Sequence, residues 1–534
     1  MDAQTLRRIR ADFPILSTRI DGQPLVYFDN AATTQKPRAV IDAITQYYRR
    51  DNANVHRAAH HLATRATDQF EGVRDQVAQF INASPNEIVW TRGTTEAINL
   101  VAESFLRPLI APGDRIMIAI SAHHACLLPF QRLVQDVGAH LDVVALDDNG
   151  DLDLSHFNEL LKRRPRFVAL PHVSNVLGTV YPIKTLVKAA KSAGAYTLID
   201  GAQAAPHFSL DMNDINADFY AFSGHKLFGP TGIGVLFGRH ALLDKMPPWQ
   251  VGGEMIEHVT LEETRYAPAP LRFEAGTPDI AGVIGLGAAI RYLSTLDTDI
   301  LTQHEQTLVN HLREGLTELP GITLLSAGTH SVSLVNFYHE SINAADIVMH
   351  LDAQGIAARA GSHCAQPLLN ALNLTATVRL SLAFYNTLQE VEHTLSALRE
   401  MVYSNEEPNS ASGISDMILA LEHADNWPDR LNLLMTLGAV RTDSHPLRES
   451  RYLVPGCASQ TWIKITQTAQ QTHLEGDSES RQIKGLIHLI AAKVNQGHSI
   501  EWIRDYLTGL GLERQLSRSR GNAIAHLLDW LDAR

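Results

Sequence analysis

Cysteine is scarce in this sequence. Only three occur in 534 residues, and so small and odd a number argues against a disulfide-stabilised scaffold. Each thiol is therefore interpreted from its own surroundings. Cys364 lies in a stretch of small and polar residues, and Cys457 follows a Pro-Gly turn signal. Cys126 lies among apolar residues, so we expect it to be buried and inert.

Long apolar runs and an excess of basic residues are also absent. No run approaches the roughly 18 residues of a membrane-spanning helix. The first eight residues contain no apolar signal core. A net charge of −13 argues against a general nucleic-acid surface. We expect a soluble cytoplasmic protein with reduced thiols and neither membrane nor nucleic acid as partner.

Metal and dinucleotide motifs are incomplete. The histidines of the segment 56–61 have ligand-like spacing. The segment lacks the glutamate of the zinc-protease motif, however, and no third ligand is evident elsewhere in the chain. The glycine-rich stretch 232–238 runs into a strand-like segment, so it does not match a dinucleotide loop. We expect no metal site.

Strand-like and helical patterns alternate between residues 85 and 240. This alternation predicts an α/β fold with a mostly parallel sheet covered by helices on both faces. Functional sites in such sheets gather where strands end. The expected strands lie at 115–120, 167–170, 197–200 and 233–237, and the expected helices at 65–82 and 183–193.

The length of the chain predicts more than one domain. A smaller α/β unit follows the large one, with a strand near 332–337 and a helix near 347–354. A polar, aperiodic stretch then indicates a flexible linker, and a small α+β domain follows, with a strand at 461–466 and a helix around 483–490. The expected division is a large domain over residues 21–289, a small domain over 290–403 joined by the N-terminal segment, a linker over 404–413 and a C-terminal domain over 414–534.

Lys226 and Asp200 each follow or end a buried-looking strand. A surface lysine would be the ordinary interpretation, but Lys226 is preceded by Ser223, Gly224 and His225 rather than by other charges. An amine that binds a carbonyl and a carboxylate that holds a ring nitrogen protonated are what pyridoxal 5′-phosphate (PLP) requires. The pair therefore predicts a PLP site.

Hydroxyl and ring side chains complete this prediction. Thr94 and Thr95 open a helix, where alone they would be interpreted as caps. With Ser223 and His225 as further donors, phosphate binding becomes the better interpretation. His123 offers a flat ring to lie over the pyridine, and Asn175 a donor to the phenolic oxygen.

Residues 1–403 resemble a cysteine desulfurase of the SufS/CsdA type, a fold-type I PLP enzyme of the class V aminotransferase family. The matching stretches are Tyr27–Ala32, Asn54–Arg57, Gly93–Asn99, Ser223–Lys226, Phe273–Pro278, Arg359–Pro367 and Arg379–Thr387. Their order over the whole segment makes chance similarity improbable.

The resemblance implies a role for each site residue. L-cysteine would be the substrate, and the chain would act as a homodimer. Lys226 would bind the cofactor, Cys364 would be the nucleophile, and His123 would stack on the ring and pass a proton. The remaining roles would be Asp200 on the pyridine nitrogen; Gln203 and Asn175 on the phenolic oxygen; Thr94, Thr95, Ser223 and His225 on the phosphate, with Thr277 from the other subunit; Arg379 on the substrate carboxylate; and Asn30 and His56 lining the substrate pocket.

The C-terminal domain resembles SufE/CsdE, the sulfur acceptor of this enzyme group. Cys457 would be the acceptor thiol, charged by Cys364, with iron–sulfur cluster assembly and its scaffold as the implied destination. A flexible tether can hold such a thiol at a local concentration on the order of millimolar. The stretches that carry this resemblance are Gly456–Trp462, Gly476–Glu479, Lys484–Leu486 and Leu516–Arg520.

The sequence departs from the family pattern at two places. Ser362 replaces the histidine or glutamine of the familiar loop pattern, and Gly521-Asn522 replaces a Ser-Gln-Gly pattern after Arg520.

Three competing functions also stay open. Selenocysteine lyase or cysteine sulfinate desulfinase activity could use the same PLP site. The chain could also be an ordinary class V aminotransferase, or a sulfur-carrier scaffold with a degenerate PLP site.

Overall fold

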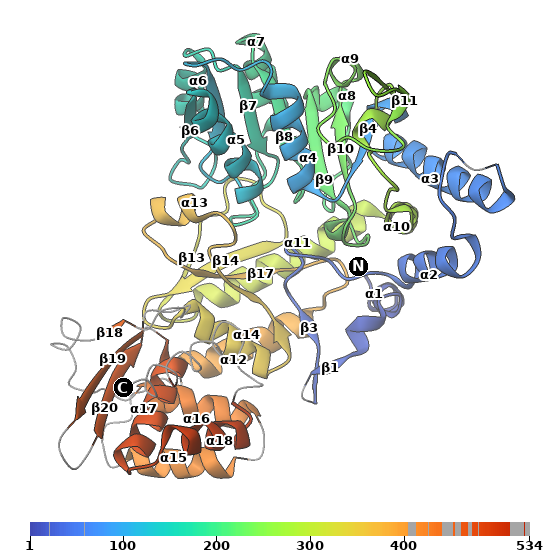
Figure 1. Cartoon of the computed structure of the whole chain (residues 1–534). Coiled ribbons are helices and arrows are strands. Elements are labelled where there is room, and N and C mark those ends of the chain that lie inside the picture. Colours follow the sequence, from blue (N-terminus) through green and yellow to red (C-terminus); the bar gives the residue numbers. More distant parts are fainter. Residues whose placement is uncertain are drawn as a thin grey trace.

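The computed structural model describes residues 1–20, 22–57, 59–403, 413–424, 427–439, 452–453, 461–467, 472–478, 480–512 and 528. Cys457 and the predicted linker, apart from residue 413, lie outside the described residues. A large domain, a small domain and a C-terminal domain follow one another down the molecule in Figure 1.

The large domain is built on a seven-stranded sheet. Strand β10 runs antiparallel to its neighbours β4 and β9, and every other neighbouring pair is parallel, so the predicted mostly parallel sheet is confirmed. The order across the sheet is β4 (Ile88–Thr91), β10 (Gly234–Gly238), β9 (Phe219–Ser223), β8 (Tyr196–Asp200), β7 (Phe167–Pro171), β5 (Arg115–Ala119) and β6 (His140–Val144).

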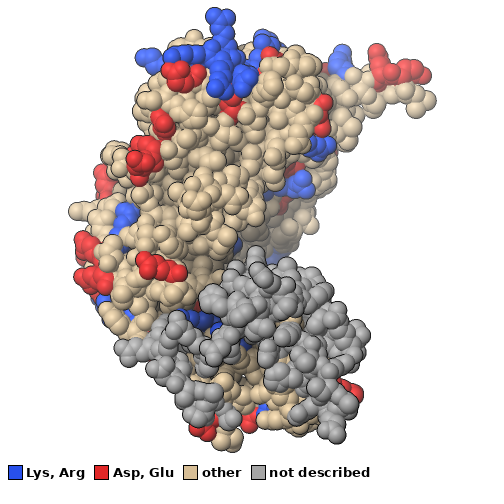
Figure 2. All heavy atoms as spheres, turned by 90° about the vertical axis from the view of Figure 1, so that its left-hand side faces the viewer, with Lys and Arg blue, Asp and Glu red and all other residues tan. Residues whose placement is uncertain are grey.

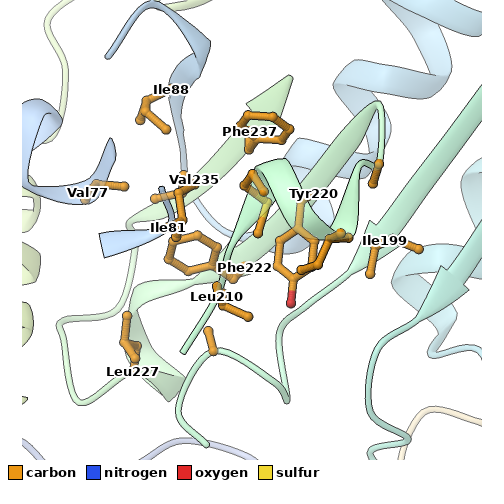
Figure 3. Packing of buried hydrophobic residues seen from close by; sticks show 14 of the residues in the cluster. Val77, Ile81, Ile88, Ile199, Leu210, Tyr220, Phe222, Leu227, Val235 and Phe237 are labelled. Carbon is orange, nitrogen blue, oxygen red and sulfur yellow. The ribbon is translucent and has the colours of Figure 1, made fainter. Parts of the chain in front are cut away.

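Alternate side chains of each strand enter two separate cores. Val235 and Phe237 pack with Val77 of α3 on one face, as Figure 3 shows, whereas Leu236 packs with α4 and α5 on the other. Because both faces are covered, most of these strands are largely apolar, and the apolar runs of β5, β7, β8 and β10 are the ones that the sequence predicts. The helices of this domain are α2 (Arg38–Gln46), α3 (His61–Phe80), α4 (Thr94–Leu100), α5 (His124–Val137), α6 (Leu154–Leu161), α7 (Ile183–Ser192), α8 (Met212–Ile215), α9 (His240–Leu243) and α10 (Ile280–Ser294).

The small domain is an antiparallel sheet whose main core is shared with α11, α12 and α14, whereas α13 packs against Val176 and Leu177 of the large domain. The predicted strand and helix are β14 and α12, and Ile9 and Phe13 of the N-terminal segment pack with Phe384 and Tyr385. Val26 and Phe28 also enter its core, although they lie inside the range assigned to the large domain. Its elements are α1 (Ala3–Ala11), β3 (Val26–Tyr27) paired with β15 (Ile356–Ala357), the sheet β13 (Ile322–Leu324), β14 (Leu334–His339), β17 (Thr377–Ser381) and β16 (Arg359–Gly361), and α11 (Thr298–Thr317), α12 (Ala344–Ala353), α13 (Gln366–Ala371) and α14 (Leu388–Tyr403).

The C-terminal domain contains the strand and helix that the sequence predicts at 461–466 and 483–490. Within the described residues it packs on α12 of the small domain, and Leu431 and Met435 enter the small-domain core. Its elements are α15 (Gly413–His423), α16 (Trp427–Ala439), the antiparallel strands β18 (Tyr452–Leu453), β19 (Thr461–Gln467) and β20 (Thr472–Ser478), α17 (Arg481–Asn495) and α18 (Ile500–Gly509).

Charges of both signs are scattered over the face drawn in Figure 2, with Lys and Arg gathered at its upper end. Within the described part of the chain, no helix on its own has the length and apolarity to cross a membrane. The pair α10 and α11, bent by 87°, passes that test only when taken together.

Candidate active site

One cavity of about 300 Å³ collects side chains from the ends of five strands. Asp200 is the last residue of β8 and Ser223 the last of β9, and these strands are parallel neighbours. Thr94, His123 and Asn175 follow β4, β5 and β7, so all of these residues meet at one edge of the sheet. The predicted residues that line the cavity are Thr94, Thr95, His123, Asn175, Asp200, Gln203, Ser223, His225, Lys226, Cys364 and Arg379.

Lys226 and Asp200 lie together in this cavity. Burial lowers the pKa of Lys226 to about 8, although the attraction of Asp200 opposes the shift. Burial raises the pKa of Asp200, while the Ala202 amide, which donates to its carboxylate at 3.0 Å, opposes the rise. A buried carboxylate is costly without a cationic partner, and a protonated ring nitrogen would supply one.

The start of α4 lines the cavity with two hydroxyl side chains. Gly93, at φ +154°, occupies the N-cap position without a side-chain cap, so Thr94 and Thr95 lie inside the first turn rather than capping it. The Thr94 amide donates to Ser223 Oγ at 2.9 Å, and the two hydroxyls are 2.7 Å apart. Burial, with the cations Lys226 and Lys36, lowers the pKa of His225 to about 4. Helix-start amides, hydroxyls and a neutral imidazole are a donor set suited to phosphate.

His123 is held as one tautomer at the start of α5. The Ala125 amide donates to its Nδ1 at 3.0 Å, so the ring proton lies on Nε2. Burial, followed by the nearby cation of Lys226, lowers the pKa of His123 to about 4. The ring is therefore neutral at pH 7, with Nε2 available as a donor.

Arg379 is buried and only partly satisfied. Its Nη1 donates to Asn175 O at 2.9 Å and its Nη2 to Asp29 Oδ1 at 3.3 Å, whereas Nε has no partner among the described residues. Burial lowers the pKa of Arg379 to about 10, and Asp29 opposes the shift. A guanidinium that lines the cavity suits a carboxylate, which it can bind with two donors.

Asp29 is a site residue that the sequence reasoning missed. It accepts from Arg359 Nε at 2.9 Å and Nη2 at 2.7 Å as well as from Arg379, and thus joins two arginines beside the cavity. Its place within the Tyr27–Ala32 stretch, which carries part of the family resemblance, was the available signal. The pairing itself had none, because the partners are more than 300 positions apart.

Cys364 is exposed and sits on a tightly fixed loop. His363 and Cys364 take φ of +51° and +56°, a conformation that residues other than glycine adopt at a cost. The His124 amide donates to Cys364 O at 2.8 Å, and Asn175 Nδ2 donates to His363 O at 2.7 Å. Both bonds come from the large domain, so the loop that carries the thiol is fixed across the domain boundary.

Three predicted residues lie outside this cavity in the single chain. Asn30 is buried, donates from Nδ2 to Ser381 O at 2.8 Å and accepts from the Tyr385 hydroxyl. His56 is exposed and pairs with Glu71 at 2.8 Å. Local contacts thus occupy both side chains in one chain, and a role for Asn30 and His56 in the substrate pocket stays a prediction.

The third, Thr277, lines a second cavity of about 380 Å³ with Trp249 and Phe273. Its predicted role is in the other subunit of a homodimer and stays a prediction.

Gln203 lines the first cavity and donates to Ala31 O at 2.7 Å. Cys126 is fully buried. Among the described residues, no three His, Cys, Asp or Glu side chains are grouped to hold a metal.

Comparisons with known proteins identify two families along the chain. The class-V aminotransferase family matches residues 26–394, and the SufE family, described as an Fe-S metabolism associated domain, matches residues 415–534. A probable cysteine desulfurase of Vibrio cholerae is 44% identical over 398 residues, which cover 74% of this chain and 98% of that protein. The crystal structure of the cysteine desulfurase CsdA from Escherichia coli has a TM-score of 0.70 and 40% identity, covering 75% of this chain and 98% of that one.

Some relatives are longer than the matched region. A cysteine desulfurase of Synechococcus elongatus is 47% identical over 397 residues, which cover 74% of this chain but only 63% of that protein. The chain thus spans less than two thirds of the length of several curated relatives. The family match confirms PLP as the cofactor, and the amine, carboxylate and phosphate-binding donors described above fit it. The chain therefore belongs to the class-V aminotransferase family, with its fold-type I architecture, and carries a SufE-family domain at its C-terminal end.

Proposed function

We propose that this chain is a cysteine desulfurase, which converts L-cysteine to L-alanine and retains the sulfur as a persulfide on Cys364. The observation that carries the proposal is one cavity lined by Lys226, Asp200, Arg379 and an exposed cysteine thiol. An ordinary aminotransferase has no use for the thiol, and a degenerate carrier has no use for the Lys226–Asp200 pair. When bound, PLP withdraws electrons from the substrate Cα and so makes its sulfur open to attack.

The residues of the cavity divide the remaining work. Arg379, which lines the cavity, binds the substrate carboxylate through its guanidinium. Lys226, with its pKa of about 8, can take a proton at Cα and return it, since it changes charge near neutral pH. His123 can give the proton on Nε2 to the product, because its Nδ1 already accepts from the chain.

Cys364 receives the sulfur. Its thiolate attacks the substrate sulfur, so that an S–S bond forms and the C–S bond breaks with its electron pair moving to carbon. That carbon is later protonated, which leaves alanine and a Cys364 persulfide. No outside oxidant or reductant is needed, because the carbon that gains the electron pair is reduced while the two sulfur atoms are oxidised to the persulfide level.

We further propose that Cys457 takes the outer sulfur of this persulfide, in the manner of thiol–disulfide exchange. The match of residues 415–534 to a domain family associated with Fe-S metabolism supports this step and suggests iron–sulfur cluster assembly as its destination. The step regenerates the Cys364 thiol and leaves the persulfide on Cys457.

A homodimer is part of the proposal. Apolar side chains lie exposed around the hairpin of β11 (Ile256–Val259) and β12 (Thr264–Tyr266), including a fully exposed Leu261 and the half-exposed Trp249 and Val259. We propose that a second copy of the chain covers this apolar surface. Thr277 lies near Trp249 and outside the cofactor cavity of its own chain, so it could reach the cofactor cavity of the second copy.

The test compares Cys364→Ser with Cys126→Ala, a buried control thiol, in the PLP-loaded chain. After incubation with L-cysteine, we expect Cys364→Ser to form no alanine and to show no added sulfur on Cys457 by mass spectrometry. Cys126→Ala should match the parent. Alanine and a Cys457 persulfide formed by Cys364→Ser would contradict the proposal. Turnover of only selenocysteine or cysteine sulfinate by both variants would instead favour a lyase or desulfinase.

A further inference from the structure

Lys36 is a partly buried lysine that the proposed chemistry does not use. It lies between β3 and α2, and no described carboxylate pairs with it. Burial lowers the pKa of Lys36 to about 7. Holding an ammonium group in such a place is costly, so its contacts must offset that cost.

Those contacts converge on one carbonyl oxygen. Lys36 Nζ donates to His225 O at 2.7 Å and to Thr34 O at 2.5 Å. The hydroxyls of Thr33 and Thr34, and the Thr34 amide, each lie 3.1 Å from the same His225 oxygen. Four donors thus surround an acceptor with two lone pairs, and the ammonium is the nearest of them.

The carbonyl of His225 belongs to the peptide bond that joins it to Lys226. Fixing this oxygen fixes the peptide plane, and with it the point from which the Lys226 side chain extends. The next residues are strained, since the buried Phe228 takes φ +59° and its amide donates to Thr34 Oγ1 at 2.9 Å. A strained backbone persists only where its surroundings hold it.

We propose that Lys36 is a positioning residue for Lys226, acting with Thr33 and Thr34 through the His225 carbonyl. The proposal rests on the proposed function only in taking Lys226 as the residue that binds PLP. It assigns no contact between Lys36 and the substrate or cofactor, because Lys36 does not line the cavity.

The test replaces Lys36 by Met, whose unbranched side chain is one atom shorter and carries no hydrogen-bond donor. Lys188→Met is the control, since Lys188 is exposed on α7. In the cofactor-free chains, we expect amide hydrogen exchange at residues 227–229 to speed up about tenfold in Lys36→Met alone. In the PLP-loaded chains, the pH midpoint of the lysine-bound absorbance band should shift, and kcat should fall about 10- to 100-fold with KM within about twofold.

Thr33→Val removes one donor without removing the ammonium, and should give the same changes at smaller amplitude. It carries the test if Lys36→Met fails to fold. Exchange equal to that of the parent in both variants, or an equal change in Lys188→Met, overturns the proposal. A parent chain without the absorbance band or without alanine formation would count against the proposed function instead, and the exchange measurement would still report on Lys36.

Discussion

At the scale of single residues, the position of the thiol is set by backbone strain that neighbouring residues hold in place. Two successive left-handed residues cost roughly 1–3 kcal/mol each. The bonds from His124 and Asn175 offset part of that cost and aim the loop at the cavity. Ser362, where the sequence departs from the familiar pattern, precedes these two residues, and its carbonyl accepts from the Ala365 amide at 2.9 Å.

Asp29 gives a prediction at this scale. In Asp29→Asn, Arg379 and Arg359 lose their shared anionic partner, so the guanidinium that is proposed to bind the substrate carboxylate is less well oriented. We expect KM for L-cysteine to rise about tenfold with a smaller change in kcat. Steady-state kinetics of alanine formation measure both, with the exposed Asp42→Asn on α2 as control. A fall in kcat at unchanged KM would show that Asp29 acts elsewhere.

At the scale of elements, the sequence predicted strand ends better than contacts between domains. The strands of the large domain are buried on both faces, and their apolar runs placed Asp200, Ser223 and Lys226 at one edge. The links from Asp29 to Arg359 and from His124 to Cys364 join segments far apart in the chain and leave no periodic signal. Asn30 and His56 were predicted from resemblance alone, and their local partners in the single chain could not be inferred from it.

The joint between α12 and α17 supplies the prediction for elements. Asp346 is fully buried, and its carboxylate accepts from Ser480 Oγ at 2.6 Å and from the Arg481 amide at 2.8 Å, at the first turn of α17. A carboxylate at a helix start is favoured by the free amides and by the helix dipole.

In Asp346→Asn, we expect this joint to weaken by about 1–3 kcal/mol, because the charge-assisted bonds are lost. Hydrogen exchange should then speed up in the first turn of α17, and sulfur should reach Cys457 at a different rate while alanine formation supported by a small thiol stays unchanged. Asp299→Asn is the matched control, since Asp299 also lies in the first turn of a small-domain helix but is exposed. Equal exchange in the two variants would rule out a role for the carboxylate.

At the scale of the whole molecule, contacts as well as chain connectivity join the C-terminal domain to the small domain. The sequence predicted a free tether, whereas the described residues also share apolar contacts and a buried carboxylate between the C-terminal and small domains. The domain is therefore held as well as tethered. The composition of the C-terminal domain does not predict these contacts with the small domain. Apolar residues such as Leu431 and Met435 could equally well pack in the domain's own core.

The buried histidines of the large and small domains predict how stability depends on pH. Burial lowers the pKa of His123, His172 and His225 to about 4 and that of His363 to about 3, against about 6.5 in an unfolded chain. Between these values the unfolded chain binds more protons, so the free energy of unfolding falls as pH falls from 6.5 towards 4.

We expect a loss of up to about 1 kcal/mol per histidine and pH unit in the cofactor-free chain, measured by denaturant unfolding at pH 6.5 and 4.5. His172→Gln should reduce the slope, and the exposed His140→Gln should leave it unchanged. A free energy of unfolding that is constant over this range would contradict the assignment of neutral, buried rings.

The hydrogen bond from His124 to Cys364 has a consequence for how the enzyme can be switched. The start of α5 fixes both His123, the proposed proton source, and the loop of Cys364, the proposed nucleophile. A movement that carried the small domain away from the large one would break this bond as it withdrew the sulfur. One helix start therefore positions both groups. We expect activity to be lost completely when the domains separate, rather than to fall gradually with the distance between them.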